Sequence, residues 1–222
     1  MNRVAAIFAH PDDEILGCGG TLALHKKNKD IVDVCFISSG LKSRTNNKIS
    51  LERLRNDSKK ANDLIGVNSV AFSEFPDNQL DSISLLKITK YIETFLRKKK
   101  SNIIYTHHVG DLNIDHEIVH KAVLTATRPV EKSIVKEIYS CEVNSSTEWA
   151  FNSKNLFSPT NFVDISKTIK KKINALSMYY TELRDFPHPR SKEGVEVLAR
   201  LRGMQSGLKF AEAFLTVRKI SN

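Results

Sequence analysis

Cysteine is scarce in this chain, and no apolar run is long enough to cross a membrane. Only three cysteines occur among the 222 residues, at positions 18, 35 and 141. An odd, widely spaced set of thiols does not make a disulfide framework, so we expect buried, reduced cysteines and a cytoplasmic protein. The sequence contains no stretch of about 18 apolar residues, and its first residues lack the features of a secretory signal, so we predict neither a transmembrane segment nor a leader.

Repeats, low-complexity tracts and linker-like segments are also missing from the sequence. The hydrophobic fraction of 41% and the charged fraction of 27% are ordinary for a folded protein and exclude disorder, collagen and coiled coil as the main class. A chain of this length buries about 70–75% of its unfolded surface, so it needs no disulfide or structural metal to fold. We therefore expect one domain that spans residues 1–222.

Acidic residues are outnumbered by basic ones, 25 against 34, which gives a formal net charge of +9. Such an excess suits a nucleic acid, an anionic membrane surface or an anionic small substrate. The densest basic runs, at 97–100 and 170–172, are explained by a helix C-terminus and by the solvent face of an amphipathic helix. Since no stacking aromatic residues alternate with these lysines, we predict no nucleic-acid partner. The charge favours an anionic substrate.

Apolar runs alternate with helix-spaced segments along the first 128 residues. Strands are predicted at 4–9, 30–39, 69–75 and 102–106. Helices are predicted from Gly17 to Lys27 and at 50–65, 84–99 and 115–128. Strands that alternate with helices predict an α/β fold, which we expect to be a single Rossmann-like domain with a mostly parallel sheet and helices on both faces.

The C-terminal third is less regular. Strands are predicted at 135–143 and 162–165, and a helix at 167–183. Ser191 is predicted to cap the N-terminus of a last helix that reaches Ser206, with Gly207 as its C-terminal glycine.

Polar clusters follow three of the predicted strands. Residues 10–14 read His-Pro-Asp-Asp-Glu, residues 76–78 read Pro-Asp-Asn, and residues 107–116 contain three histidines and two aspartates. Because ligands bind beyond the carboxyl ends of the strands in open α/β sheets, we expect these clusters to lie at one edge. A catalytic zinc needs about three protein ligands and an open position for water.

Three side chains from two of these clusters fit that requirement. We predict that His10 and Asp13 converge on one ion and that His116 completes the set. Asp12 would point elsewhere, free to accept a proton from the metal-bound water. Zinc suits this donor set, and Fe²⁺ or another divalent ion is the alternative.

A competing pattern overlaps the last cluster. Residues 116–120 read His-Glu-Ile-Val-His, the signature of zinc peptidases, with Glu117 as the base. That hypothesis leaves the His-Pro-Asp-Asp-Glu cluster unexplained, and His120 lies one turn further into the predicted helix than His116. A third hypothesis, from another class, is a basic nucleic-acid-binding domain without catalysis.

The two polar clusters together resemble the LmbE/PIG-L family of zinc-dependent N-deacetylases. The similarity continues through residues 126–129, 142–149 and 188–191, and so covers nearly the whole chain. It implies a Rossmann-like fold and the hydrolytic removal of an acetyl group from an N-acetylglucosamine-type sugar on a lipid, a nucleotide or a small alcohol. It also implies that His10, Asp13 and His116 are the zinc ligands and that Asp12 is the general base.

One departure from the family pattern concerns the group that stabilises the oxyanion. Many members carry a histidine three residues before the last ligand, and Asn113 stands at that position here. Either the amide of Asn113 takes over this role, or His107 or His108 supplies the positive charge from the start of the loop. We favour His108.

Other polar residues are candidates for substrate contacts. Asp77 and Asn78 follow a predicted strand and can bond sugar hydroxyls, and Trp149 can stack on a sugar face or pack half-buried. Guanidinium groups suit a phosphate, and the arginines considered, each with a surface ion pair as the alternative, are Arg53, Arg55, Arg128 and Arg190. The expected partner is an anionic N-acetylated amino-sugar conjugate, and the sequence is compatible with a homo-oligomer.

Overall fold

The computed structural model describes residues 1–38, 51–131, 133–151 and 154–221. Within these ranges seven strands form one sheet in the order β3-β2-β1-β4-β5-β7-β6. Strands β1 to β5 are parallel, whereas β7 is antiparallel to both β5 and β6. The predicted mostly parallel α/β sheet is therefore confirmed. The strands are β1 (Arg3–Phe8), β2 (Ile31–Ser38), β3 (Ser69–Phe75), β4 (Ile103–His107), β5 (Glu137–Cys141), β6 (Asn161–Asp164) and β7 (Ala211–Lys219).

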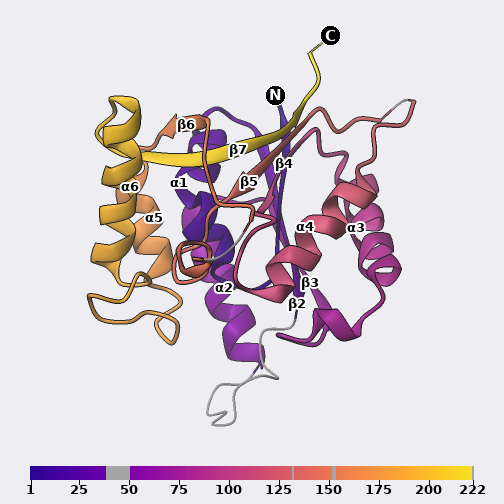
Figure 1. The fold of residues 1–222 in the computed structure, drawn as a ribbon, viewed down its shortest axis with the longest axis horizontal. Coiled ribbons are helices and arrows are strands. Elements are labelled where there is room, and N and C mark those ends of the chain that lie inside the picture. The colour runs from indigo at the N-terminus through magenta and orange to yellow at the C-terminus, as the bar shows by residue number, and fades with distance from the viewer. Residues whose placement is uncertain (39–50, 132, 152–153, 222) are drawn as a thin grey trace.

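Helices cover both faces of this sheet, as predicted (Figure 1). On one face lie α1, α2 and α5, which contact one another, and on the other lie α3 and α4; α6 packs against β7. The helices are α1 (Asp13–Lys27), α2 (Leu51–Ile65), α3 (Leu85–Lys99), α4 (Ile114–Ala126), α5 (Ile169–Leu176) and α6 (Lys192–Ser206), with short 3-10 turns at Leu80–Ser82 and Thr147–Trp149. None of the helices in the described ranges combines the length and apolar character needed to cross a bilayer.

The sheet separates two layers of apolar core, and the inner strand β1 contributes to both. Val4, Ala6 and Phe8 belong to the layer beneath α1, α2 and α5, while Ala5 and Ile7 belong to the layer beneath α3 and α4. Because alternate side chains of a strand point to opposite faces, a continuous apolar run is what a strand buried on both faces requires.

The first helix begins earlier than the sequence predicts. It starts at Asp13, since the Asp12 carbonyl accepts hydrogen bonds from the Ile15 and Leu16 N–H groups, and it is kinked at Cys18. Its glycines do not open the helix; they let it lie close to neighbouring elements. A Cβ added at Gly20 would come within 2.9 Å of the Ile165 side chain. The earlier start of the helix places Asp13 and Glu14 in its first turn.

The helix predicted at 167–183 is shorter in the structure, where α5 ends at Leu176. The chain continues through i→i+3 turns, in which Met178 and Tyr179 donate to the carbonyls of Ala175 and Leu176. These turns bury Tyr179 completely, and its hydroxyl bonds the Glu14 carboxylate. The segment that follows α5 is therefore held by a tertiary contact with Glu14 of the His-Pro-Asp-Asp-Glu segment.

The last helix is predicted correctly and the last strand is missed. Ser191 Oγ accepts from the Gly194 N–H at 2.8 Å, and Gly207 has φ +74° after the helix ends. Strand β7 is not predicted because a glutamate interrupts its apolar pattern. In the structure Glu212 is buried, and its carboxylate accepts from Lys172 and from two backbone N–H groups of α1. Lys172, which was predicted to lie on the solvent face of its helix with its neighbours, is therefore buried instead, because it pairs with Glu212.

Candidate functional site

The polar clusters meet at the carboxyl edge of the sheet, where β1 and β4 lie side by side. The chain leaves β1 for β2 on one side of this pair and returns to β4 on the other, so a crevice forms where the strand order reverses. His10 follows β1 by two residues, and His107 is the last residue of β4. The expectation that separate clusters share one edge is confirmed.

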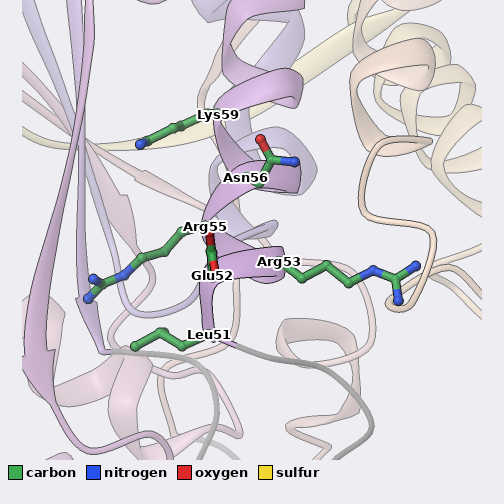
Figure 2. A pocket seen from close by; sticks show the side chains of 6 residues that line it. All are labelled: Leu51, Glu52, Arg53, Arg55, Asn56 and Lys59. Carbon is green, nitrogen blue, oxygen red and sulfur yellow. The ribbon is translucent and has the colours of Figure 1, made fainter.

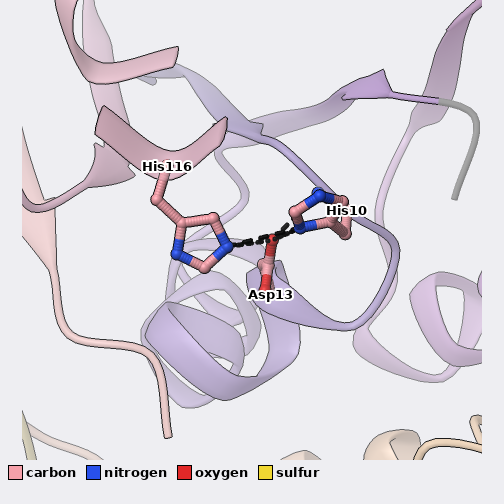
Figure 3. Close-up of side chains that lie close together, drawn as sticks. All are labelled: His10, Asp13 and His116. Atoms are coloured by element: carbon pink, nitrogen blue, oxygen red, sulfur yellow. Dashed lines mark hydrogen bonds and ion pairs between the residues drawn. The ribbon is translucent and has the colours of Figure 1, made fainter. Parts of the chain in front are cut away.

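His10, Asp13 and His116 converge at this edge (Figure 3). Their nearest nitrogen and oxygen atoms all lie within 4.8 Å of one another. Asp13 Oδ2 is 3.3 Å from His10 Nδ1 and 3.3 Å from His116 Nε2, and the two ring nitrogens are 3.3 Å apart. The structure thus brings together the three side chains predicted from the sequence as metal ligands.

The other nitrogen of His10 faces a second pair of carboxylates. Nε2 lies 3.1 Å from Asp115 Oδ2 and 3.3 Å from Asp77 Oδ1, and these three residues form another group close enough to hold a cation. Asp115 already accepts the backbone N–H groups of Asn78 and Leu80. We interpret Asp115 as the partner that holds the proton on Nε2, which leaves Nδ1 of His10 to face Asp13.

The donor set of His10, Asp13 and His116 fits a divalent metal. Asp13 is fully buried, and no described residue donates a hydrogen bond to its Oδ1. Burial lowers the pKa of His10 and of His116, but the carboxylates around them, Asp115 and Asp13 foremost for His10 and Asp13 and Asp111 for His116, raise the two values to about 10 and about 9. The site therefore favours positive charge, and two imidazoles with a carboxylate are ligands that zinc prefers.

Asp12 adopts a backbone conformation that is rare for a residue with a side chain, with φ +107°. Its N–H donates to Glu14 Oε2 at 3.0 Å, and Glu14 Oε1 accepts from Tyr179 at 2.7 Å and from Asn62 at 2.8 Å. Burial raises the pKa of Glu14 to about 7 despite these donors. The buried Glu14 network thus supports the unusual backbone conformation of Asp12.

The side chain of Asp12 lies beside a cation from the far end of the chain. Arg190 Nη1 donates to Asp12 Oδ2 at 3.2 Å and lies 3.5 Å from Glu182 Oε2. Burial raises the pKa of Asp12 well above its ordinary value, and the Arg190 guanidinium opposes this effect. A carboxyl with a raised pKa next to a metal site suits proton transfer in both directions.

A small cleft of about 70 Å³ opens over these residues. Besides His10 and Asp12, its wall includes four residues that were predicted to contact the substrate or the oxyanion, Asp77, Asn78, Asn113 and Arg190. It also includes Glu182, which no sequence pattern indicated. The lining residues are His10, Pro11, Asp12, Leu54, Asp77, Asn78, Asn113, Glu182 and Arg190.

Asn113 is held by both ends of its side-chain amide. Oδ1 accepts from the Asp115 N–H at 2.9 Å and caps α4, and Nδ2 donates to Asn78 Oδ1 at 3.2 Å. Asn113 therefore lines the cleft from the N-terminus of the helix that carries His116.

The two histidines considered with Asn113 are placed elsewhere. His108 Nε2 lies 2.7 Å from the Asn155 carbonyl oxygen, and its ring packs against Phe157, outside the residues that line the cleft. His107 Nε2 accepts from the Ala9 N–H, its ring stacks on that of His116, and burial followed by the His116 charge lowers its pKa well below the ordinary value. Of the candidates for the oxyanion role, the structure therefore places Asn113, and not the favoured His108, at the cleft.

Three of the predicted substrate contacts lie outside the cleft. Arg55 pairs with Glu74 at 2.6 Å in a separate surface depression of about 790 Å³ at the start of α2 (Figure 2). Arg128 is exposed beyond the end of α4, which extends about 15 Å along its axis from His116 to Ala126. Trp149 is 38% exposed and contacts His188 edge-on. The local sequence does not distinguish these residues from Arg190, because the distance of a side chain from the cleft depends on how the chain folds.

The overlapping peptidase pattern does not assemble. His120 Nδ1 lies 2.8 Å from the His107 carbonyl oxygen and belongs to neither candidate metal group found in the described residues. Glu117 forms an i,i+4 ion pair with Lys121 on the helix surface. His120 and Glu117 are therefore accounted for by packing and by surface charge, and the structure does not support the zinc-peptidase alternative.

Sequence comparisons support this site. The family model described as "PIG-L: GlcNAc-PI de-N-acetylase" matches residues 5–127, a range that contains all three candidate ligands and Asp12. A diacetylchitobiose deacetylase from Thermococcus kodakarensis is 24% identical over an alignment that covers 96% of this chain and 82% of that protein.

Two solved structures with folds similar to this chain are enzymes with different named activities. N,N'-diacetylchitobiose deacetylase from Pyrococcus horikoshii has a TM-score of 0.79 at 17% identity and covers 97% of this chain and 83% of its own. GalB, the 4-carboxy-2-hydroxymuconate hydratase from Pseudomonas putida KT2440, has a TM-score of 0.75 at 18% identity over 100% and 98% of the two chains. Because one fold accommodates both of these enzymes, the activity has to be argued from the residues of the site.

Proposed function

This chain belongs to the PIG-L family of GlcNAc-PI de-N-acetylases, and from that premise we propose that it is a metal-dependent hydrolase that removes the acetyl group of an N-acetylglucosamine-type sugar conjugate. One observation carries the proposal. Three metal-type donors, His10, Asp13 and His116, lie within 4.8 Å of one another. His10 and the neighbouring Asp12 line the cleft. Zinc is the metal we propose, with another divalent ion as the alternative.

The metal site is assigned to His10 Nδ1, His116 Nε2 and Asp13. A divalent metal bound there would supply a Lewis acid, which makes a water more acidic and an acyl carbonyl carbon more electrophilic. Asp115 orients His10 for this role through its contact with Nε2.

Asp12 acts as general base and then as general acid. It accepts a proton from the attacking water as the new C–O bond forms at the acetyl carbonyl carbon. As the C–N bond breaks, Asp12 returns that proton to the leaving amine, so that one amide and one water give one acetic acid and one amine. The raised pKa of Asp12, caused by burial and moderated by Arg190, favours a carboxyl that is both acceptor and donor.

The developing oxyanion needs a donor, and Asn113 is the residue we assign to it. Asn113 lines the cleft, and a single donor such as its side-chain amide is typically worth about 3–4 kcal/mol in the transition state. Asp77 and Asn78 line the same cleft and are proposed to bond sugar hydroxyls.

We also propose that the conjugate carries an anionic group. The support for this is the net charge of +9. Arg190, which lines the cleft, gives no separate support, since it already contacts the carboxylates of Asp12 and Glu182.

The test is release of free amine from a panel of N-acetylhexosamine conjugates, neutral and phosphorylated, with and without a chelator. We expect turnover of at least one conjugate, loss of turnover with the chelator, and recovery when Zn²⁺ or Fe²⁺ is added back. His10→Ala and His116→Ala should each lose the metal as well as the activity. A chain that purifies with stoichiometric metal but deacetylates none of the panel would contradict the sugar assignment, and full activity in excess chelator would contradict the metal.

A further inference from the structure

We propose that Asp111 is a positioning residue that sets the orientation of His116 and anchors the turn 145–147 against the metal site. This proposal rests on the proposed function, because the assignment of His116 as a metal ligand is part of that function. Asp111 lies in the loop between β4 and α4, and its side chain is fully buried.

Three hydrogen bonds and one ion-pair contact converge on this one carboxylate. Oδ1 lies at an ion-pair distance of 3.1 Å from His116 Nδ1 and accepts the Asn113 N–H at 2.9 Å. The Ser146 hydroxyl also donates to Oδ1, and Thr147 Oγ1 donates to Oδ2 at 2.6 Å. Both oxygens are thus engaged on the side of His116 that faces away from Asp13, which makes Asp111 a partner of the ligand and not a ligand itself.

The contact with Nδ1 determines what the other ring nitrogen can do. A neutral imidazole carries one N–H, and a carboxylate beside Nδ1 holds that proton there. The lone pair of Nε2 then faces Asp13 Oδ2 and His10 Nδ1, each 3.3 Å away. Since a metal binds the nitrogen without the proton, Asp111 selects the form of His116 that can act as a ligand.

A second set of contacts extends this influence to the base. Ser146 and Thr147 are fixed by Asp111, and the adjacent Ser145 accepts a hydrogen bond from Arg190 Nε at 2.7 Å. Arg190 in turn donates to Asp12. The turn that Asp111 anchors therefore carries the group that holds the guanidinium against the general base.

The experiment measures Zn²⁺ affinity by competition with a chromophoric chelator, and the absorption spectrum of the Co²⁺-loaded protein, on the full chain. For Asp111→Asn we expect Zn²⁺ affinity about 10–100-fold weaker than wild type and a changed Co²⁺ spectrum. In steady-state assays kcat should fall while KM stays close to wild type. Asp33→Asn is the matched control, since Asp33 is also buried and bonds Ser69 and Lys99 at a distance from the site; it should leave Zn²⁺ affinity unchanged.

The outcomes separate this inference from the proposed function. Wild-type Zn²⁺ affinity and an unchanged Co²⁺ spectrum in Asp111→Asn would overturn the positioning role and leave the metal site intact. A wild-type chain that binds no Zn²⁺ and no Co²⁺ would overturn the metal site, and this inference with it. If Asp111→Asn does not fold, Ser146→Ala decides: weaker Zn²⁺ binding supports the anchoring role, and unchanged binding refutes it.

Discussion

Arg190 Nη1 lies 3.2 Å from Asp12 Oδ2, although 178 residues separate the two in sequence. The same nitrogen lies 3.5 Å from Glu182 Oε2, so one guanidinium serves two buried carboxylates at the cleft wall. Removing such a cation would leave both carboxylates with less compensation, which is costly in a buried site. This contact is the basis of the first prediction.

Arg190→Lys should lower kcat by about 10²-fold with a much smaller change in KM. A lysine ammonium lacks the planar fork that reaches Ser145 and Asp12 together, so Asp12 loses its fixed position, and small misplacements have effects of this size. Steady-state kinetics on the best conjugate of the panel measure the split. Arg200→Lys, in an exposed pair with Glu196, is the control. A rise in KM alone would instead assign Arg190 to substrate binding.

Asp12→Asn should retain about one metal per chain and lose turnover by about 10²–10⁴-fold. The asparagine keeps the size of the side chain but cannot accept a proton from water. Metal analysis and amine release on the same preparation check both halves of the prediction. An Asp12→Asn protein with wild-type turnover would end the assignment of Asp12 as general base.

Asn113→Asp should separate helix capping from catalysis. The aspartate keeps an oxygen that can accept the Asp115 N–H, so the thermal midpoint should stay close to wild type, but it removes the amide donor. We expect kcat to fall by about 10²–10³-fold. Thermal unfolding and kinetics on one preparation test this pair of effects, and an active variant would return the oxyanion role to another group.

Glu117→Gln should have wild-type activity, because Glu117 pairs with Lys121 on the surface of α4. His116→Ala, one residue earlier, should lose its metal. Metal content and amine release measured on both variants distinguish the deacetylase from a peptidase. Loss of activity in Glu117→Gln with the metal retained would favour the peptidase mechanism.

Asp30→Asn should destabilise the protein by about 1–3 kcal/mol at neutral pH. Burial raises the pKa of Asp30, but hydrogen bonds from His25 and the Asn2 N–H outweigh it and lower the pKa overall. A carboxyl whose folded pKa is depressed contributes stability above its unfolded pKa of about 3.9 and loses it as pH falls through the folded value. Unfolding at pH 7 and at pH 3 should show the wild-type advantage shrinking in acid, and a pH-independent difference would contradict this origin.

Much of the site was predictable because its donors follow strand ends. A run such as Val4–Ala9, stopped by His10 and Pro11, predicts a buried strand and places the next polar residues at its carboxyl edge. Asp111 and Glu14 stood in the same motifs but carried no sign of their roles, since a carboxylate that orients a neighbour looks the same in sequence as one that binds a metal.

The positions of Glu182 and Arg190 at the cleft could not be predicted from the local sequence pattern. Whether a C-terminal arginine reaches Asp12, as Arg190 does, or is exposed at the far end of a helix, as Arg128 is, depends on the path of the chain through space. The same holds for β7, whose apolar pattern is interrupted by Glu212; this glutamate can be buried because Lys172 and two N–H groups of α1 surround its carboxylate.

The amino-acid sequence by itself determined the alternation of strands and helices and the residue types that can hold a cation, because both are written in short-range periodicity and in the chemistry of neighbouring side chains. The tertiary structure decided which of these side chains face one another, which histidine nitrogen is turned toward Asp13, and which arginine stands beside the base. Those choices depend on contacts between segments more than a hundred residues apart, and their geometry exists only after the sheet has assembled.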